Sequence, residues 1–301
     1  MKPLNRCIAT IEPRAGALEP SSNYMGIVIG IDVGISTTKI VGISEKGEII
    51  SLIRIKATDP VASLYGAFGR YLHDNGINLG DVRQVMLTGV GSAYIEDPIY
   101  GLPTEKVQEF MADGLGARFE TRLDRMLVVS MGTGTSFVRC DGDSIRHIGG
   151  IGVGGGTLQG LARIMLKTGD IAQVVELSKG GDLSRINVLI GDISPRPLPG
   201  LPSDAIASLF GNAQSDATRE DIALGILWTV LQSICSAAIL SSMDCGIKDF
   251  VMIGKLSMLP LCEQVFAACE SLYGVRFHVP EHSEFSTAIG AALSYTKEKA
   301  E

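Results

Sequence analysis

The sequence predicts an α/β protein with two lobes, and three observations support this fold class. The chain has 301 residues, which is enough for two lobes that each bury a core. Hydrophobic residues make up 46% of the chain and charged residues 20%, as in globular rather than disordered proteins. Apolar runs typical of buried strands are followed by helical patterns, and this order is loosely repeated. We therefore predict lobes at residues 25–120 and 121–301, with a ligand cleft between them.

Composition also indicates which partners the protein binds and in which cellular compartment it occurs. The net charge of −7 argues against nucleic acid as a partner. The longest apolar run is too short and too interrupted to cross a membrane. Six cysteines without C-x-x-C spacing favour reduced thiols and a cytoplasmic protein. Residues 1–24 show neither periodicity nor the apolar region of a signal peptide, so we expect a flexible extension.

The first lobe is predicted as three antiparallel strands, a helix and a fourth strand. The expected strands are residues 26–32, 40–44 and 50–56, followed by a helix at 60–76 and a strand at 82–91. Asn75 and Gly76 are a good helix stop. This βββαβ order is typical of a ribonuclease-H-like unit, which binds ligands at its strand ends. A proline-containing loop at 98–106 and a helix at 106–117 complete the lobe.

The turn after the first strand predicts a phosphate site. It supplies hydroxyl and N–H donors and the charge of Lys39, while Asp32 at the strand end can hold Mg²⁺ through water. The turn is no Walker A loop, because G-x-x-x-x-G-K-[ST] does not occur. The alternative is an ordinary strand-end turn with a surface lysine. The predicted site residues of this turn are Asp32, Gly34, Ser36, Thr37, Thr38 and Lys39.

Three acidic residues recur every four positions along the helix predicted at 106–117. Glu105, Glu109 and Asp113 would then share roughly one helical face. One carboxylate near the cleft could take a proton from a substrate hydroxyl. Glu109 is the best candidate, because Phe110 would partly desolvate it. The alternative is a solvated acidic face.

A glycine-rich stretch in the second lobe predicts a nucleotide site. Strands at 126–130, 136–140 and 145–149 enclose the Gly-Thr-Gly-Thr-Ser turn at 132–136. Residues 149–156 contain six glycines and lead into a helix that starts at Thr157. Glycine allows close backbone approach, and a helix N-terminus suits phosphate. The alternative is a pair of tight turns.

The rest of the chain continues the second lobe. The longest helical pattern, residues 219–244, is apolar nearly all round, which indicates burial against the lobe or a second subunit. Small residues at 287–292 favour close packing of the last helix. The other expected elements are a helix at 171–181, a proline-rich loop at 183–202, a strand at 250–254, a helix at 258–272, a strand at 275–280 and a helix at 285–299.

Several motifs in this order resemble the type II pantothenate kinases, which belong to the superfamily of acetate kinase, sugar kinases and actin. The resemblance runs from Met25 to about Ser294. It implies two ribonuclease-H-like lobes of the actin-like ATPase type, with a nucleotide cleft between them. The motifs are GIDVGISTTK, EFMADGLG, MGTGTS, HIGGIGVGGGTLQGL, ASLFGN, FVMIG and EFSTAIGAAL.

The resemblance implies MgATP-dependent phosphorylation of the terminal hydroxyl of pantothenate, the first step towards coenzyme A. Glu109 would be the catalytic base, residues 34–39 the first phosphate loop, and Ser136 a substrate contact. The helix near 219–244 would form much of a homodimer interface. The implied nucleotide contacts are Thr133, Gly155, Gly156 and Gln159, beside Thr157 at the predicted helix start.

The sequence departs from the family pattern at three places. The first loop reads Gly34-Ile35-Ser36 instead of Gly-Gly-Thr, and the spacing after Glu109 is shorter. The family places an arginine on the substrate carboxylate just before the glycine loop, where this chain has His147 after Arg146. Neighbouring strand residues point to opposite faces, so Arg146 could replace that arginine only through a register change or bulge. A neutral histidine binds a carboxylate less firmly than arginine, so pantetheine stays an alternative acceptor.

Two other functions are compatible with the same fold. Dehydratase-activating ATPases open with a similar loop but carry cluster-binding cysteines, and this sequence has no suitable pair. A non-catalytic regulator would bind ATP without turnover. A zinc-containing sugar-kinase repressor is disfavoured, because its Cys/His pattern is missing.

Overall fold

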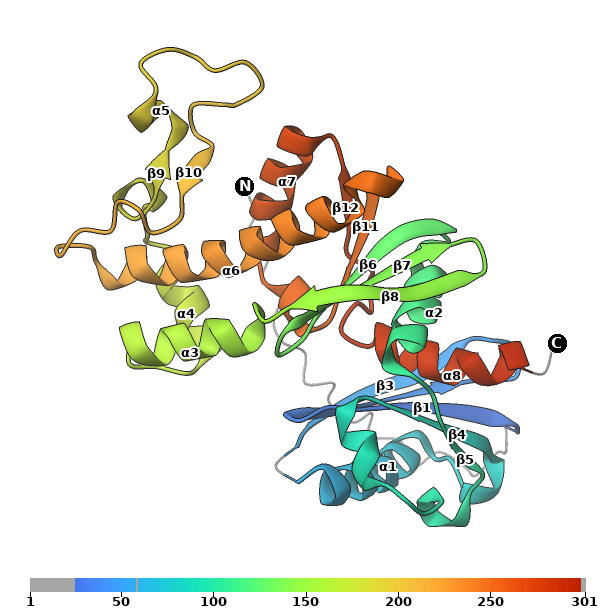
Figure 1. Ribbon diagram of the computed structural model, residues 1–301. Helices are drawn as coiled ribbons and strands as arrows, with labels where there is room; N and C mark the ends of the chain where they lie inside the picture. The colour runs from blue at the N-terminus through green and yellow to red at the C-terminus, as the bar shows by residue number, and fades with distance from the viewer. Residues whose placement is uncertain (1–24, 58, 299–301) are drawn as a thin grey trace, which may run out of the picture.

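The computed structural model describes residues 25–57 and 59–298. Two five-stranded sheets lie apart, and helices α2 (Glu109–Thr121) and α8 (Ser286–Glu298) run between them (Figure 1). The predicted two-lobed α/β fold is confirmed. The extension predicted at residues 1–24 lies outside the described residues.

The first sheet has the strand order β3-β2-β1-β4-β5. β1, β2 and β3 are antiparallel neighbours, whereas β4 is parallel to β1 and β5 to β4. The prediction of a loop over residues 98–106 was wrong for its last residues, because they form β5, which pairs with β4. Three residues are too short for a readable alternation, so only the pairing with β4 defines this strand. The bounds are β1 (Ile27–Val33), β2 (Thr37–Ile43), β3 (Ile49–Lys56), β4 (Val82–Thr88) and β5 (Thr104–Lys106).

Helix α1 (Pro60–Asn75) covers the outer face of the first sheet. The carboxylate of Asp59 accepts a hydrogen bond from the Ala62 N–H at 2.6 Å, and Pro60 takes the first helical position. Gly76 ends the helix with φ 63°, which glycine adopts without strain. The predicted helix and its stop are confirmed.

The second sheet repeats this plan in the order β12-β11-β6-β7-β8. β6, β7 and β8 are antiparallel, while β11 is parallel to β6 and β12 to β11. The three strands predicted around the Gly-Thr turn are confirmed. The bounds are β6 (Arg125–Met131), β7 (Thr135–Asp141), β8 (Ser144–Ile151), β11 (Asp249–Ile253) and β12 (Arg276–His278).

Four helices build the core on the outer face of the second sheet. They are α3 (Gly155–Met165), α4 (Ile171–Ser178), α6 (Arg219–Ser242) and α7 (Cys262–Tyr273). The predicted proline-rich loop at 183–202 is only partly irregular. It contains strand β9 (Val188–Leu189) and helix α5 (Ile190–Ile193), and β9 pairs with β10 (Ile206–Ser208) in a ribbon that projects from the lobe (Figure 1).

Helix α6 is the long apolar helix that the sequence predicts. Residues 219–245 are long and apolar enough, by length and composition, to cross a membrane, so the expectation of no such segment was wrong. However, 56% of the most apolar 18-residue stretch of this segment is buried inside the protein. Leu227, Val230 and Ile234 are fully buried in the core of the second lobe. The helix is therefore a core helix of that lobe in this structure.

The two inner helices connect the lobes. α8 packs on the first sheet, where Ile289 joins the cluster of Val28 and Met86, although it follows the second sheet in the chain. α2 packs on the second sheet, where Ala117 meets Val128. The lobe boundary at residue 120 stays a prediction, because these helices link both sheets.

Glycines allow the inner helices to approach closely. A Cβ atom at Gly290 would lie 1.8 Å from the carbonyl oxygen of Ala112, and one at Gly116 would lie 1.9 Å from that of Ser286. A Cβ atom at Gly30 of β1 would lie 2.0 Å from the carbonyl oxygen of Ala288. The prediction of small residues for close packing of the last helix is confirmed.

The described cysteines are all free thiols. Cys140, Cys235, Cys262 and Cys269 are buried, in line with the apolar helical patterns in which several of the cysteines occur. Burial raises the pKa of Cys262 to about 12 and that of Cys140 to about 11. These thiols are poor nucleophiles, because the thiolate is the reactive form.

Candidate active site

An ion pair lies at the end of β1, next to the turn that leads into β2. Asp32 and Lys39 face each other across β1 and β2, and the Lys39 ammonium donates to the Asp32 carboxylate at 2.9 Å. Their side chains are only 10% and 12% exposed. Burial alone would lower the pKa of Lys39, but the charge and hydrogen bond of Asp32 outweigh this effect and raise it. The pair therefore keeps a cation fixed at the strand end.

The turn between these strands is tight. The Gly34 N–H donates to the Thr37 carbonyl at 3.0 Å, and a Cβ atom at Gly34 would lie 2.8 Å from that oxygen. Ser36 is exposed and Thr37 half-buried, so both can reach a ligand. Thr38 is fully buried in the first lobe, so the structure does not bring this predicted contact to the cleft.

Glu109 is the first residue of α2 and lies close to this pair. It is half-buried, and burial raises the pKa of its carboxyl group. Asp32 raises this pKa further, while Lys39 lowers it, so all three groups interact. The structure thus brings together the carboxylate and the phosphate turn that the sequence predicted separately.

The predicted acidic face does not exist, because the helix starts later than the sequence suggests. Glu105 lies exposed in β5, and the Val107 N–H still donates to the Leu87 carbonyl of β4 at 2.8 Å. Strand pairing thus overrides the helical pattern before Glu109. Asp113 is fully buried rather than solvated. Its small neighbours on α2, Ala112 and Gly114, are the signal that could have predicted this burial.

The Gly-Thr turn and the start of α3 form one unit. The N–H groups of Gly155 and Gly156 donate to the carbonyls of Gly132 and Thr133, at 2.8 and 2.9 Å. These two donors are therefore already used within the turn, and a nucleotide contact for Gly155 or Gly156 stays a prediction. A Cβ atom at Gly154 would lie 2.6 Å from the Thr133 oxygen, so glycine is required for this contact. Thr133 is exposed at this turn, and its contact with a nucleotide stays a prediction.

Thr157 and Gln159, two further residues predicted to contact the nucleotide, form hydrogen bonds within the same segment. The Thr157 hydroxyl donates to the Gly152 carbonyl at 2.9 Å and accepts from the Gly154 N–H at 3.3 Å. The Gln159 amide donates to the Gly169 carbonyl at 3.0 Å. α3 starts at Gly155, two residues before the predicted start. Both side chains thus hold the loops around the turn, and a ligand contact for either stays a prediction.

His147 rather than Arg146 lies beside α2. The imidazole stacks on Phe110 with ring centroids 3.8 Å apart and planes at 9°. A bulge next to Ile148 shifts the register, yet Arg146 stays opposite Arg139, on the other face of the sheet. Ser136 lies two residues before Val138, the partner of His147, so both belong to the same face. His147 and Ser136 thus lie on the face that α2 covers, and substrate contacts of Ser136, Arg146 and His147 stay predictions.

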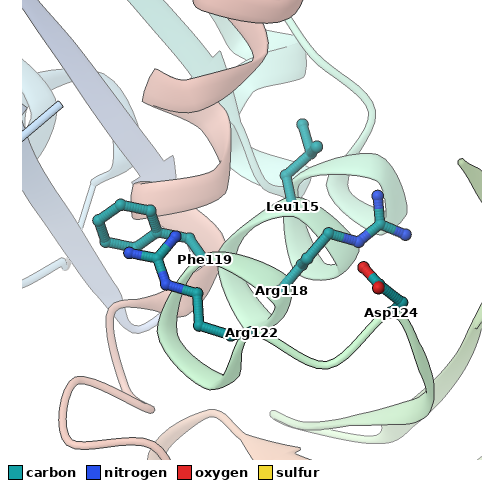
Figure 2. A pocket seen from close by; sticks show the side chains of 5 residues that line it. All are labelled: Leu115, Arg118, Phe119, Arg122 and Asp124. Carbon is teal, nitrogen blue, oxygen red and sulfur yellow. The ribbon is translucent and has the colours of Figure 1, made fainter. Parts of the chain in front are cut away.

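A shallow pocket lies at the other end of α2. It has a volume of about 350 Å³, and the Arg122 guanidinium lies 5.0 Å from the centre of the Phe119 ring (Figure 2). Its lining begins at Leu115, six residues after Glu109, which corresponds to roughly 9 Å along the helix axis. The pocket is therefore distinct from the carboxylate site. Its lining residues are Leu115, Arg118, Phe119, Arg122 and Asp124.

Comparison with solved structures defines the class of fold as the actin-like ATPase fold. An activator of 2-hydroxyisocaproyl-CoA dehydratase from Clostridium difficile, solved with ADPNP, has a TM-score of 0.65 at 18% identity, covering 91% of this chain and 97% of that one. A dehydratase component from Acidaminococcus fermentans has 0.64 at 20% identity, covering 92% and 100%. A ROK family protein from Streptococcus pneumoniae has 0.59 at 11% identity, covering 91% and 99%.

The sequence comparisons define the family. The Fumble family model matches residues 116–294, and the chain belongs to this family. A type II pantothenate kinase of Staphylococcus aureus is 27% identical over 273 residues, which cover 87% of this chain and 97% of that protein. The resemblance to type II pantothenate kinases that the motifs indicated is therefore confirmed.

Proposed function

We propose that this protein transfers the γ-phosphoryl group of ATP to the terminal hydroxyl of pantothenate. The proposal is supported by its relatives, which are named type II pantothenate kinases, and by structural neighbours solved with ATP analogues. The single observation that carries it is the cluster of Glu109, Asp32 and Lys39 at the turn that follows β1. A carboxylate and a fixed cation beside a turn with free hydroxyl donors suit phosphoryl transfer.

Glu109 acts as the general base in this proposal. The proton of the acceptor hydroxyl passes to its carboxylate while the hydroxyl oxygen attacks the γ-phosphorus in line. Burial raises its pKa, which makes Glu109 a stronger base than a solvated carboxylate. Lys39 lowers the same pKa and so partly opposes the effect of burial.

ATP lies between the two turns in this proposal. Gly34, Ser36, Thr37 and Thr133 offer backbone and hydroxyl donors, and Lys39 stabilises negative charge on the phosphates. Helix N-terminal donors at Gly155 and Gly156 act indirectly, because they fix the Thr133 turn. Closure of the lobes around α2 and α8 would exclude water and so prevent ATP hydrolysis.

Magnesium is implied by this chemistry, and the residues fit a particular mode of binding. The described residues offer no group of three or more His, Cys, Asp or Glu side chains that could hold a metal ion. Mg²⁺ commonly uses one carboxylate, waters and substrate phosphates. Asp32, with one oxygen bonded to Lys39, would contact a magnesium-bound water through its other oxygen. When bound, the ion neutralises charge on the phosphates.

A second acceptor, pantetheine, follows from one observation. His147 stacks on Phe110, the residue that follows Glu109, whereas Arg146 lies on the other face of the sheet. Histidine is a weaker partner for the pantothenate carboxylate than a bidentate arginine. An uncharged acceptor of the same shape has no carboxylate, so replacing arginine by histidine would not weaken its binding.

A turnover assay with three acceptors tests the proposal. ATP consumption is coupled to a dye reaction, with pantothenate, pantetheine and a neutral pantothenamide offered separately. Strong turnover with pantothenate supports the proposal. Turnover with the uncharged acceptors alone makes the protein a kinase of pantetheine-like substrates. ATP binding without turnover on any acceptor would instead indicate a regulator on the same fold.

We further propose a cytoplasmic homodimer that uses α6 and binds neither nucleic acid nor membranes. Most of α6 is covered by its own lobe, so the contact would involve its exposed end, where Leu240 is 65% and Met243 66% exposed. Light scattering of the purified protein measures its mass in solution. A monomer, or a dimer unaffected by Leu240→Glu, would contradict this interface.

A further inference from the structure

Asp113 is a fully buried carboxyl group at the crossing of α2 and α8. It is 0% exposed, and the Thr287 hydroxyl of α8 donates to its Oδ1 atom at 2.7 Å. Its Oδ2 atom is buried without a hydrogen-bond partner in the described part of the chain. A buried carboxylate oxygen without a partner disfavours the ionised form. The side chain lies one helical turn after Glu109 and has no role in the proposed transfer.

The charges around Asp113 also oppose its ionisation. Glu109 on α2 and Asp32 on β1 are the acidic neighbours, and Lys39 on β2 is the cation that interacts with it. The buried thiol of Cys140 on β7 also interacts with Asp113. Glu284, before α8, acts on Lys39. Burial, opposed by hydrogen bonds from Thr287 and Ser130, raises the pKa of Asp113 to about 7. Glu109 is only partly buried, so burial opposes its ionisation less than that of Asp113.

We propose that Asp113 is a positioning residue, whose full burial at the crossing of α2 and α8 disfavours its charge and so leaves Glu109 as the more readily ionised carboxylate of α2. The inference rests on the proposed function, in which Glu109 is the base. In the transfer, the acceptor proton passes to Glu109, the acceptor oxygen bonds to the γ-phosphorus, and the bond to ADP breaks with its electron pair on ADP. Asp113 takes no part in these bond changes.

A pH dependence follows from this role. When Asp113 ionises, the site contains three carboxylates and one ammonium group. The added negative charge repels the phosphates of ATP and disturbs the hydrogen bond from Thr287. We therefore expect kcat/KM for ATP to fall about tenfold as the pH rises from 6 to 8.5.

The test compares pH profiles of the wild type and Asp113→Asn, an isostere that stays neutral. The fall in kcat/KM for ATP above neutral pH should disappear in Asp113→Asn. It should persist in Glu105→Gln, which changes an exposed residue of β5 and serves as the control. The same fall in Asp113→Asn would overturn the proposal. If Asp113→Asn lacks turnover, carboxyl ¹³C NMR of the wild type decides. A midpoint for Asp113 near 7 supports the proposal, and one near 4 overturns it.

Glu109→Gln separates this proposal from the proposed function. Undiminished turnover in Glu109→Gln would refute the base assignment itself. An inactive Glu109→Gln together with an unchanged profile in Asp113→Asn would refute only the role of Asp113.

Discussion

Replacing Gly290 by alanine should separate the two inner helices. The new Cβ atom would lie 1.8 Å from the Ala112 carbonyl oxygen and 2.7 Å from the Gly116 nitrogen. Real Cβ atoms essentially never approach other atoms within 3.0 Å, so the helices must move apart by at least 1.2 Å, the difference between 3.0 and 1.8 Å. The clashing atoms belong to the backbone, so no side-chain rotation can relieve the contact.

The expected cost is large for a single methyl group. Overpacking costs about 1–3 kcal/mol, and a backbone clash belongs at the upper end of this range. Alanine regains up to about 1 kcal/mol of helix propensity, so we expect a net loss of about 2 kcal/mol. Because α2 carries Glu109 and Asp113, a shift of this size should also lower kcat by about 100-fold.

Urea unfolding and steady-state kinetics measure both effects. Gly160→Ala in α3 is the matched control, because a Cβ atom there meets nothing within 4 Å. It should stabilise the protein by about 0.5–1 kcal/mol through helix propensity alone. A free energy of unfolding for Gly290→Ala within about 0.5 kcal/mol of the wild type would refute the tight crossing.

Three other substitutions test separate parts of the site. Thr133→Val should weaken ATP binding by about fivefold, because it removes one hydroxyl donor, and calorimetry showing unchanged affinity would exclude this contact. His147→Arg should lower the KM for pantothenate about tenfold and leave that for pantetheine unchanged, and equal effects on both acceptors would contradict its placement at the carboxylate. Asp113→Asn tests stability against pH. Asp113 has a folded pKa of about 7, above its usual 3.8, so its contribution is complete below pH 4 and is lost as the pH rises through 7. Relative to the wild type, Asp113→Asn should gain up to about 4 kcal/mol in unfolding free energy between pH 4 and 8, and a constant difference in urea unfolding would disprove this linkage.

Local patterns in the sequence predicted most of the fold. The first three strands of each lobe, α1 with its Asn-Gly stop, and the long helix α6 are confirmed. Each has a clear signal: buried apolar runs for the strands, Pro60 and Gly76 for α1, and a continuous apolar pattern for α6. The pairing of Asp32 with Lys39 follows from the hairpin, since the two residues face each other across its short turn.

Features that depend on long-range contacts could not be predicted. α8 returns to the first sheet, and nothing in its own pattern identifies that sheet. α2 starts at Glu109 instead of Lys106, because β5 pairs with β4 and continues as far as Val107.

The orientation of the Arg146–His147 pair was also hidden, since a bulge changes the parity of strand residues. The stacking of His147 on Phe110 involves residues 37 positions apart in the chain, and the alternation of β8 alone could not place it. The burial of Asp113 likewise depends on Thr287, which lies 174 residues away.

Substitution of the proposed base tests the central claim most directly. Transfer of phosphate from ATP to pantothenate would be followed by mass spectrometry for the wild type and Glu109→Gln, with ATP affinity measured in parallel. The proposal predicts a phosphorylated product with the wild type, a loss of at least about 100-fold in kcat for Glu109→Gln, and nearly unchanged ATP affinity. A Glu109→Gln protein that forms product at the wild-type rate would contradict the central claim.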